Sequence, residues 1–358
     1  MSNTPETSHK KLNFMDCMGM ATGQIIGSGI MVLTGIVIGM TGHGTPYAFI
    51  LGALLAILTC VPYIILTATI PASGAGYTYI KRLMGDKASF MYIGMFVLSQ
   101  VLIATFAKGF ASYFCSIFPQ FNEMLVAMLA LTVCTIVNIV GLKTTAIVQN
   151  LMVAFLLVSL FLFIGFGLPK VDWSTLAISA ANTMPNGPMN FFTGVALLSF
   201  ACGGAKFIGE NADDIENPAH TIPKAIVLST SIVAVFYALI GIVASGVLPV
   251  EDVAFENLTL ISNMGVGTDM LSEFMVLLAC WKLPDVLPEE FAKSSFAMKK
   301  STLHTILIFI GALMLFSSYV NLSDLTVPAA IACVIFIGVL FVYMQFRNKH
   351  VQAKKANK

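Results

Sequence analysis

Charge is the scarcest property of this sequence. Only 10% of its 358 residues are Asp, Glu, Lys or Arg, whereas 57% are hydrophobic. A soluble domain averages about 25% charged residues, so this composition excludes an ordinary soluble protein and predicts an integral membrane protein. The formal net charge of +1 does not by itself indicate a partner. We expect a lipid bilayer around the protein and no nucleic acid.

Motifs for cofactor, metal and enzyme chemistry are also missing. The seven cysteines are scattered and form no C-x-x-C pair, so metal and redox chemistry are not expected. No G-x-x-x-x-G-K-[ST] loop indicates ATP hydrolysis by this chain. An intramembrane enzyme would need a nucleophile with a base, and the best pair, Ser28 and His43, combines a mid-span residue with a loop residue. We therefore expect no catalytic residue, no metal and no cofactor.

Long hydrophobic runs, in contrast, are abundant. A helix needs about 20 apolar residues to cross a bilayer. Hydropathy predicts about ten such spans, at residues 14–40, 46–70, 89–118, 122–141, 145–168, 190–209, 222–248, 258–281, 303–321 and 324–346. The sequence thus predicts one all-α transmembrane domain over 14–346, an N-terminal tail at 1–13 and a basic C-terminal tail at 347–358.

The eighth span is the least apolar of these. It contains Asp269 and Glu273, and its strongly apolar part, 274–281, is short. It has to cross, because the loop before it is acidic and the loop after it is basic. We expect a polar helix that faces protein rather than lipid.

The positive charges predict the orientation. The loops that share one side of the membrane with the N-terminus carry most of the lysines and arginines, such as Lys81, Arg82 and Lys87. The loop 249–257, on the other side, has three acidic residues and neither Lys nor Arg. Because positive loops stay inside, both termini are predicted to be cytoplasmic, in a multi-pass protein of the cell membrane.

The first span has an unusual centre, Gly27-Ser28-Gly29. Glycine and serine weaken a helix. In lipid, a broken helix is tolerated where protein or a water-filled cavity surrounds it. Such a break indicates a binding site, because half-helix N–H groups can face an anion and freed carbonyls a cation. The alternative is close helix packing through small residues.

The sixth span repeats this feature at Gly203-Gly204. Ten spans divide into two sets of five, residues 14–168 and 190–346, and each set begins with a glycine-broken span. Matched breaks are typical of a five-plus-five inverted repeat with its binding site between the halves. The second break therefore favours a binding site over simple packing.

Three motifs resemble those of one transporter family. Gly27-Ser28-Gly29-Ile30 resembles G-[ST]-G-[IV], and 71–79 resembles P-x-x-G-G-x-Y-x-Y with Ala75 at one glycine position. Residues 213–226 resemble E-E-V-x-N-P…I-P-x-A-I. Together they resemble the amino acid permeases of the amino acid–polyamine–organocation (APC) superfamily, over residues 14 to about 248.

The resemblance implies a secondary active transporter, a permease or antiporter that moves amino acids or related amines by alternating access. It places the substrate carboxylate on N–H groups around Ser28, and the ammonium on carbonyls of Ile25, Phe200 and Gly203. Phe200 would also be an aromatic gate. The implied substrate-binding set is Ile25, Gly27, Ser28, Gly29, Ile30, Phe200, Gly203 and Gly204.

Lys206 is a further candidate for gating or coupling, because an ionisable residue inside a membrane is costly. It could hold an acidic substrate side chain or replace a coupling cation. Alternatively, it could pair with Glu210 one turn on, or extend to the cytoplasmic face. The sequence leaves coupling to a proton or to an exchanged substrate open.

The C-terminal half departs from the family pattern. Family members usually have twelve spans, and the region between the seventh span and Pro284 looks shortened here. This favours a second hypothesis, in which the protein keeps the fold but has lost transport and acts as a sensor or subunit. Ligand-dependent stabilisation without flux would distinguish the two.

Overall fold

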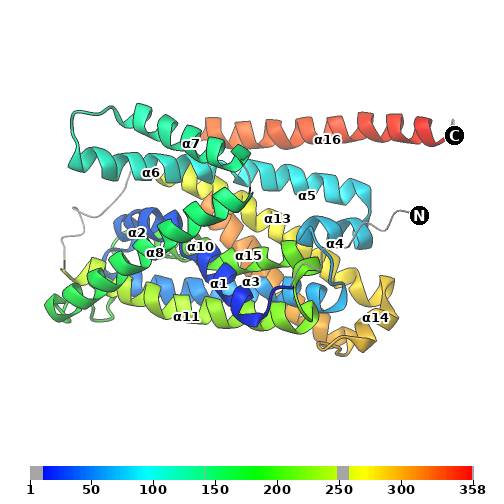
Figure 1. Ribbon diagram of the computed structural model, residues 1–358, viewed down its shortest axis with the longest axis horizontal. Helices are drawn as coiled ribbons and strands as arrows, with labels where there is room; N and C mark the ends of the chain where they lie inside the picture. The colour runs from blue at the N-terminus through cyan, green and yellow to red at the C-terminus, as the bar shows by residue number, and fades with distance from the viewer. Residues whose placement is uncertain (1–10, 141, 248–257, 357–358) are drawn as a thin grey trace.

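The computed structural model describes residues 11–140, 142–247 and 258–356, and these are almost entirely helical (Figure 1). The elements up to Cys202 are α1 (Phe14–Ile25), α2 (Ser28–Thr41), η1 (Gly42–Gly44), α3 (Thr45–Thr69), α4 (Ala75–Met84), α5 (Asp86–Ser99), α6 (Leu102–Ile117), α7 (Glu123–Val140), α8 (Leu142–Gly167), η2 (Leu168–Lys170), α9 (Ala180–Thr183) and α10 (Gly187–Cys202). After Cys202 come η3 (Gly203–Asp214), α11 (Pro218–Val247), α13 (Thr259–Val286), α14 (Pro288–Lys293), α15 (Lys300–Ser323) and α16 (Val327–Ala356).

The helices have the length and composition of membrane spans. Within the described ranges, 7 helical segments are long and apolar enough to cross a bilayer, and two shorter apolar helices lie at Glu123–Ile139 and Val327–Tyr343. One long segment, Gly29–Thr69, covers both α2 and α3. The protein is therefore an all-helical, multi-pass membrane protein. The division into ten spans and two inverted repeats stays a prediction.

Two large buried clusters make up most of the interior of the described part of the chain. The first gathers apolar side chains of α1, α2, α3, α10 and α11, where Phe49 and Tyr237 meet edge to face with ring centroids 5.7 Å apart. The second lies between α3, α4, α13 and α15 and includes Leu66, Leu283 and Leu307. Helix α3 contributes to both clusters, so it connects α1 and α2 to the polar helix α13.

The outer helices expose apolar side chains. Leu129 of α7, Phe155 of α8 and Val334 of α16 are 63%, 68% and 70% exposed. Helix α16 runs along one edge of the molecule beside α5 (Figure 1). Such surfaces need a hydrocarbon environment, which a bilayer supplies.

Helix α13 is continuous and deeply embedded. It runs from Thr259 to Val286, and both Asp269 and Glu273 are 3% exposed. The polar helix expected for the eighth span therefore faces protein. The expected shortening before Pro284 does not interrupt this helix, which passes through Pro284.

The chain ends differ in how they are held. Residues 347–356 continue helix α16 and do not form a separate element. Near the other end, Leu12 forms an isolated parallel bridge with Ile215. Of the predicted tails 1–13 and 347–358, residues 1–10 and 357–358 lie outside the described residues, as does the whole acidic loop 249–257.

Candidate functional site

The first interruption is a short stretch of extended backbone between α1 and α2. Ile26 has φ −79° and ψ 100°, and Gly27 has φ −153° and ψ −158°. The N–H of Ile26 still donates to the carbonyl of Thr22 at 2.8 Å, but neither residue has helical φ and ψ, so helix α1 ends here. The predicted break in the first span is therefore present at the predicted glycine.

Helix α2 begins at Ser28 with uncapped N–H groups. Its N-cap, Gly27, has no side chain and makes no capping hydrogen bond. The first N–H groups of a helix have no partner within that helix, and the helix dipole adds partial positive charge there. The N–H groups of Ser28, Gly29 and Ile30 thus form a potential anion site. The side chain of Ser28 lies outside the described ones.

The second interruption is a change of helix type rather than an extended break. Helix α10 ends at Cys202, and the chain continues from Gly203 as the 3₁₀ segment η3. Asn211 departs from helical geometry, with φ −108° and ψ 25°. A mid-helix stretch of 3₁₀ geometry often marks a functional hinge or a sequence under strain.

The fold brings the two interruptions into contact. A β-carbon at Gly204 would lie 2.4 Å from the carbonyl oxygen of Gln24 and 2.9 Å from the nitrogen of Ile25. A β-carbon at Gly29 would lie 3.9 Å from Ala201. Residues about 180 positions apart in the sequence therefore form one site, and Gly204 permits backbone-to-backbone approach.

Space remains beside the other two glycines. A β-carbon at Gly27 or at Gly203 would meet no described heavy atom within 4 Å. Glycine is thus not required at these two positions by packing. The two interruptions are therefore in tight contact at Gly204, and open space lies beside Gly27 and Gly203.

The carbonyls at the interruptions already accept hydrogen bonds. The hydroxyl of Tyr237 in α11 donates to the carbonyl of Ile25 at 2.9 Å. The N–H of Gly203 donates to the carbonyl of Phe200. A carbonyl oxygen has two lone pairs, so each can accept a second donor. The sequence did not indicate Tyr237, because nothing local connects it to Ile25.

Lys206 has partners that differ from those considered from the sequence. Its ammonium lies 3.5 Å from Asp269 Oδ2 and in closer contact with Glu273 Oε1, both on α13. Lys206 is 8% exposed. The pairing with Glu210 and the extension to the surface are therefore wrong. The signal in the sequence was the pair of acids spaced i, i+4 on the eighth span.

Two tyrosines lie close to this ion cluster. A β-carbon at Gly76 would lie 2.4 Å from the hydroxyl oxygen of Tyr92 and 3.2 Å from that of Tyr63, so both hydroxyls converge over Gly76. Both rings interact electrostatically with the Glu273 carboxylate. The second motif thus supplies the small residue that makes room for these hydroxyls.

The second and third motifs meet at the end of η3. The N–H of Gly74 donates to the carbonyl of Glu210 at 3.3 Å, and the N–H of Asp213 donates to Ser73 Oγ at 3.3 Å. Leu12 pairs with the strand-like backbone beyond, through bonds to Asp214 and Glu216 at 2.8 and 2.9 Å. The second and third motifs therefore meet at the end of η3, where Leu12 also binds.

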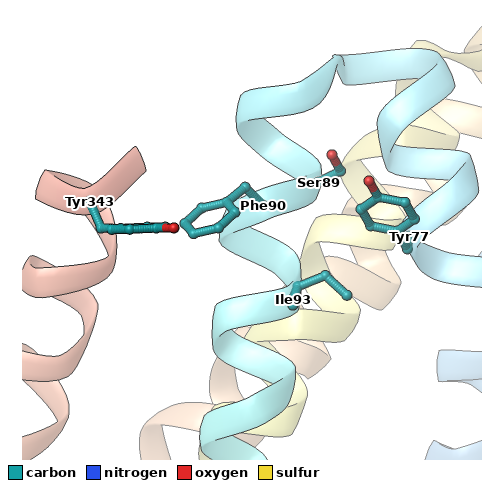
Figure 2. Close-up of a pocket in the computed structure, with 5 residues that line it drawn as sticks. All are labelled: Tyr77, Ser89, Phe90, Ile93 and Tyr343. Carbon is teal, nitrogen blue, oxygen red and sulfur yellow. The ribbon is translucent and has the colours of Figure 1, made fainter. Parts of the chain in front are cut away.

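A pocket of about 340 Å³ lies elsewhere, between α4, α5 and α16 (Figure 2). Tyr77, Ser89, Phe90, Ile93 and Tyr343 line it, and the Phe90 and Tyr343 rings face each other with centroids 5.7 Å apart. No charged residue lines this pocket, so it offers a zwitterion no ionic partner. No cluster of metal-binding side chains occurs among the residues that the structure describes.

Comparisons with known proteins agree with the motifs. The family model described as "Amino acid permease" matches residues 12–281. An uncharacterised protein of Methanocaldococcus jannaschii is 30% identical over 69% of this chain and 58% of its own length. The branched-chain amino acid permease BcaP of Bacillus subtilis is 27% identical over 67% of this chain and 55% of its own.

The chain therefore spans little more than half the length of these relatives. Among solved structures, the inward-facing conformation of Mhp1 has a TM-score of 0.44 and 14% identity, and covers 93% of this chain and 77% of its own. The resemblance found in the three motifs is confirmed by the family match. This chain belongs to the amino acid permease family of the APC superfamily.

Proposed function

We propose that this protein is a secondary transporter that carries an amino acid or a related amine across the cell membrane by alternating access. The observation that carries the proposal is the contact between the two helix interruptions, at Gly204 and Gln24. It brings η3 against the C-terminal end of α1, and the uncapped N-terminus of α2 follows that end after Ile26 and Gly27. A zwitterion needs both polarities within a few ångströms, and opposed helix ends supply them.

In this proposal the substrate carboxylate binds the N–H groups of Ser28, Gly29 and Ile30. The ammonium binds the free lone pairs of the Ile25, Phe200 and Gly203 carbonyls. The space beside Gly27 and Gly203 receives the substrate. These assignments agree with the name of the relative BcaP, a branched-chain amino acid permease.

Phe200 is the proposed gate. It is partly buried and packs against the first buried cluster, so its ring can be shielded or released as α10 moves. Lys206 already has two carboxylate partners. We therefore do not assign it to an acidic substrate side chain. The five-plus-five repeat and the cytoplasmic location of both termini are part of the same proposal.

The test is thermal stability of the purified protein across a panel of amino acids and amines, with flux of the stabilising compound into proteoliposomes. The blocking variant is Gly27→Trp, since the open space at Gly27 accepts a large side chain. The matched control is Gly19→Trp, because Gly19 lies on the neighbouring helix α1, is exposed and has no described atom within 4 Å of its β-carbon position.

We expect one ligand class to stabilise the wild type and the Gly19→Trp variant but not Gly27→Trp, with flux following the same pattern. Stabilisation without flux would instead identify a sensor or subunit. No stabilisation by any compound, with no flux, would overturn the proposal. The hypothesis that transport has been lost rests on an apparent shortening before Pro284. Helix α13 is continuous through Pro284, so it gives no support to that hypothesis.

A further inference from the structure

An unbalanced group of buried charges lies beside the proposed substrate site. Lys206 of η3 contacts the carboxylates of Asp269 and Glu273, and the three side chains are 9%, 4% and 4% exposed. With all three ionised, one positive charge faces two negative charges. A buried ion pair is tolerated when its charges balance, so the second carboxylate carries an uncompensated cost.

Glu273 holds the uncompensated oxygen. Its Oε1 contacts the Lys206 ammonium, whereas its buried Oε2 contacts no cation among the described residues, and the neutral hydroxyl of Tyr63 interacts with this carboxylate as a hydrogen-bond donor. An ionised carboxylate oxygen in a low-dielectric interior without a counter-charge is costly. This atom is therefore where a further positive charge would be most stabilising.

The groups that face Glu273 do not supply that charge. They are Lys206 of η3, Asp269 on the same helix, Tyr63 and Cys60 of α3, and Tyr92 of α5. The tyrosines and the cysteine are neutral at ordinary pH. The missing charge must therefore come from solution.

A metal ion fits this position poorly. The Lys206 ammonium already contacts both carboxylates, which is the place that a cation bridging them would take. A second cation there would be repelled at short range. A proton avoids this repulsion because it forms a covalent O–H bond and removes the negative charge.

We propose that Glu273 is a proton-binding site, with Lys206 as the group that connects its charge to the second helix interruption. Lys206 follows Gly203 and Gly204 within one turn of η3. Protonation of Glu273 turns its ion pair with Lys206 into a weaker hydrogen bond and leaves Lys206 with Asp269. The attachment of η3 to α13 then depends on the proton. Coupling of this proton to substrate movement rests on the proposed transport function.

The test is infrared difference spectroscopy of the purified protein, titrated with pH in the absence of any substrate. A protonated buried carboxyl gives a C=O stretching band that shifts in D₂O. We expect the wild type to show a titrating band and Glu273→Gln to lose it. Asp269→Asn removes the second negative charge and leaves a balanced Lys206–Glu273 pair, so its band should titrate at lower pH than that of the wild type. Gel filtration of each variant checks that it is folded. Glu273→Gln replaces the carboxylate by a neutral side chain of similar shape, which leaves a balanced Lys206–Asp269 pair.

A wild-type protein with no titrating carboxyl band, or a band retained in Glu273→Gln, would overturn the proposal. A second measurement separates it from transport: uptake of a labelled amino acid mixture into proteoliposomes, with and without an imposed pH gradient. We expect gradient-stimulated uptake in the wild type and loss of the stimulation in Glu273→Gln. A titrating band without any uptake would retain the proton site and remove the transport function.

Discussion

The α-carbon of Gly204 lies so close to Gln24 that a β-carbon there would be 2.4 Å from the Gln24 carbonyl oxygen. This relationship fixes the distance between the two helix interruptions. The neighbouring Gly203 has no such contact, since its β-carbon position meets no described atom within 4 Å. Two adjacent glycines at the same helix interruption therefore have different physical roles.

The first prediction follows from this difference. Gly204→Ala forces α1 and η3 apart, and we expect it to lower the free energy of unfolding by about 1–3 kcal/mol, the usual cost of overpacking. Gly203→Ala is the matched control and should change stability little. SDS-induced unfolding of the purified variants measures both. Equal effects of the two substitutions would contradict the proposed contact.

The second prediction concerns the ion cluster. Lys206→Met leaves Asp269 and Glu273 buried without a counter-charge, so we expect a loss of about 3–5 kcal/mol. The triple variant Lys206→Met, Asp269→Asn, Glu273→Gln has no buried charge and should recover most of that loss. A mutant cycle of unfolding free energies measures the coupling. Additive effects would show that the three side chains do not interact.

The third prediction concerns the hydrogen bond at the end of α1. Tyr237→Phe keeps the ring contact with Phe49 but removes the donor to the Ile25 carbonyl. We expect a loss of about 1 kcal/mol in unfolding free energy. The control is Tyr113→Phe, which removes a 3.1 Å bond to the Met31 carbonyl at an exposed position and should cost less. A larger loss for Tyr113→Phe would contradict this ranking.

The fourth prediction concerns the start of α1. Asn13 Oδ1 accepts hydrogen bonds from the N–H groups of Met15 and Asp16 at 2.8 and 3.0 Å, and the Asp16 carboxylate accepts from Asn13 N–H at 2.9 Å. Asn13→Ala should therefore lose about 1 kcal/mol, and Asn13→Ser, which keeps an acceptor, much less.

Hydrogen exchange of the first-turn amides is the measurement for this cap. We expect faster exchange at Met15 and Asp16 in Asn13→Ala than in the wild type, and near wild-type exchange in Asn13→Ser. Unchanged exchange in Asn13→Ala would show that the cap does not hold the first turn.

The sequence determined the local features of this protein. Apolar runs of bilayer length predict membrane helices, and glycines at Gly27 and Gly203 predict the places where two helices are interrupted. The reason is that hydropathy and helix propensity act over a few turns of one segment. The family motifs are equally local, and they were sufficient to indicate the amino acid permease family.

The tertiary structure decided which distant residues meet. Lys206 pairs with residues 63 and 67 positions away, and Tyr237 reaches a carbonyl 212 positions away. From the sequence, Lys206 had a nearer acid in Glu210 and the two acids of the eighth span had no partner. Burial changes that choice, because a charge enclosed between packed helices must find its counter-charge on whichever helix lies opposite. That neighbour is set by how all the helices pack together, which no single segment of the sequence contains.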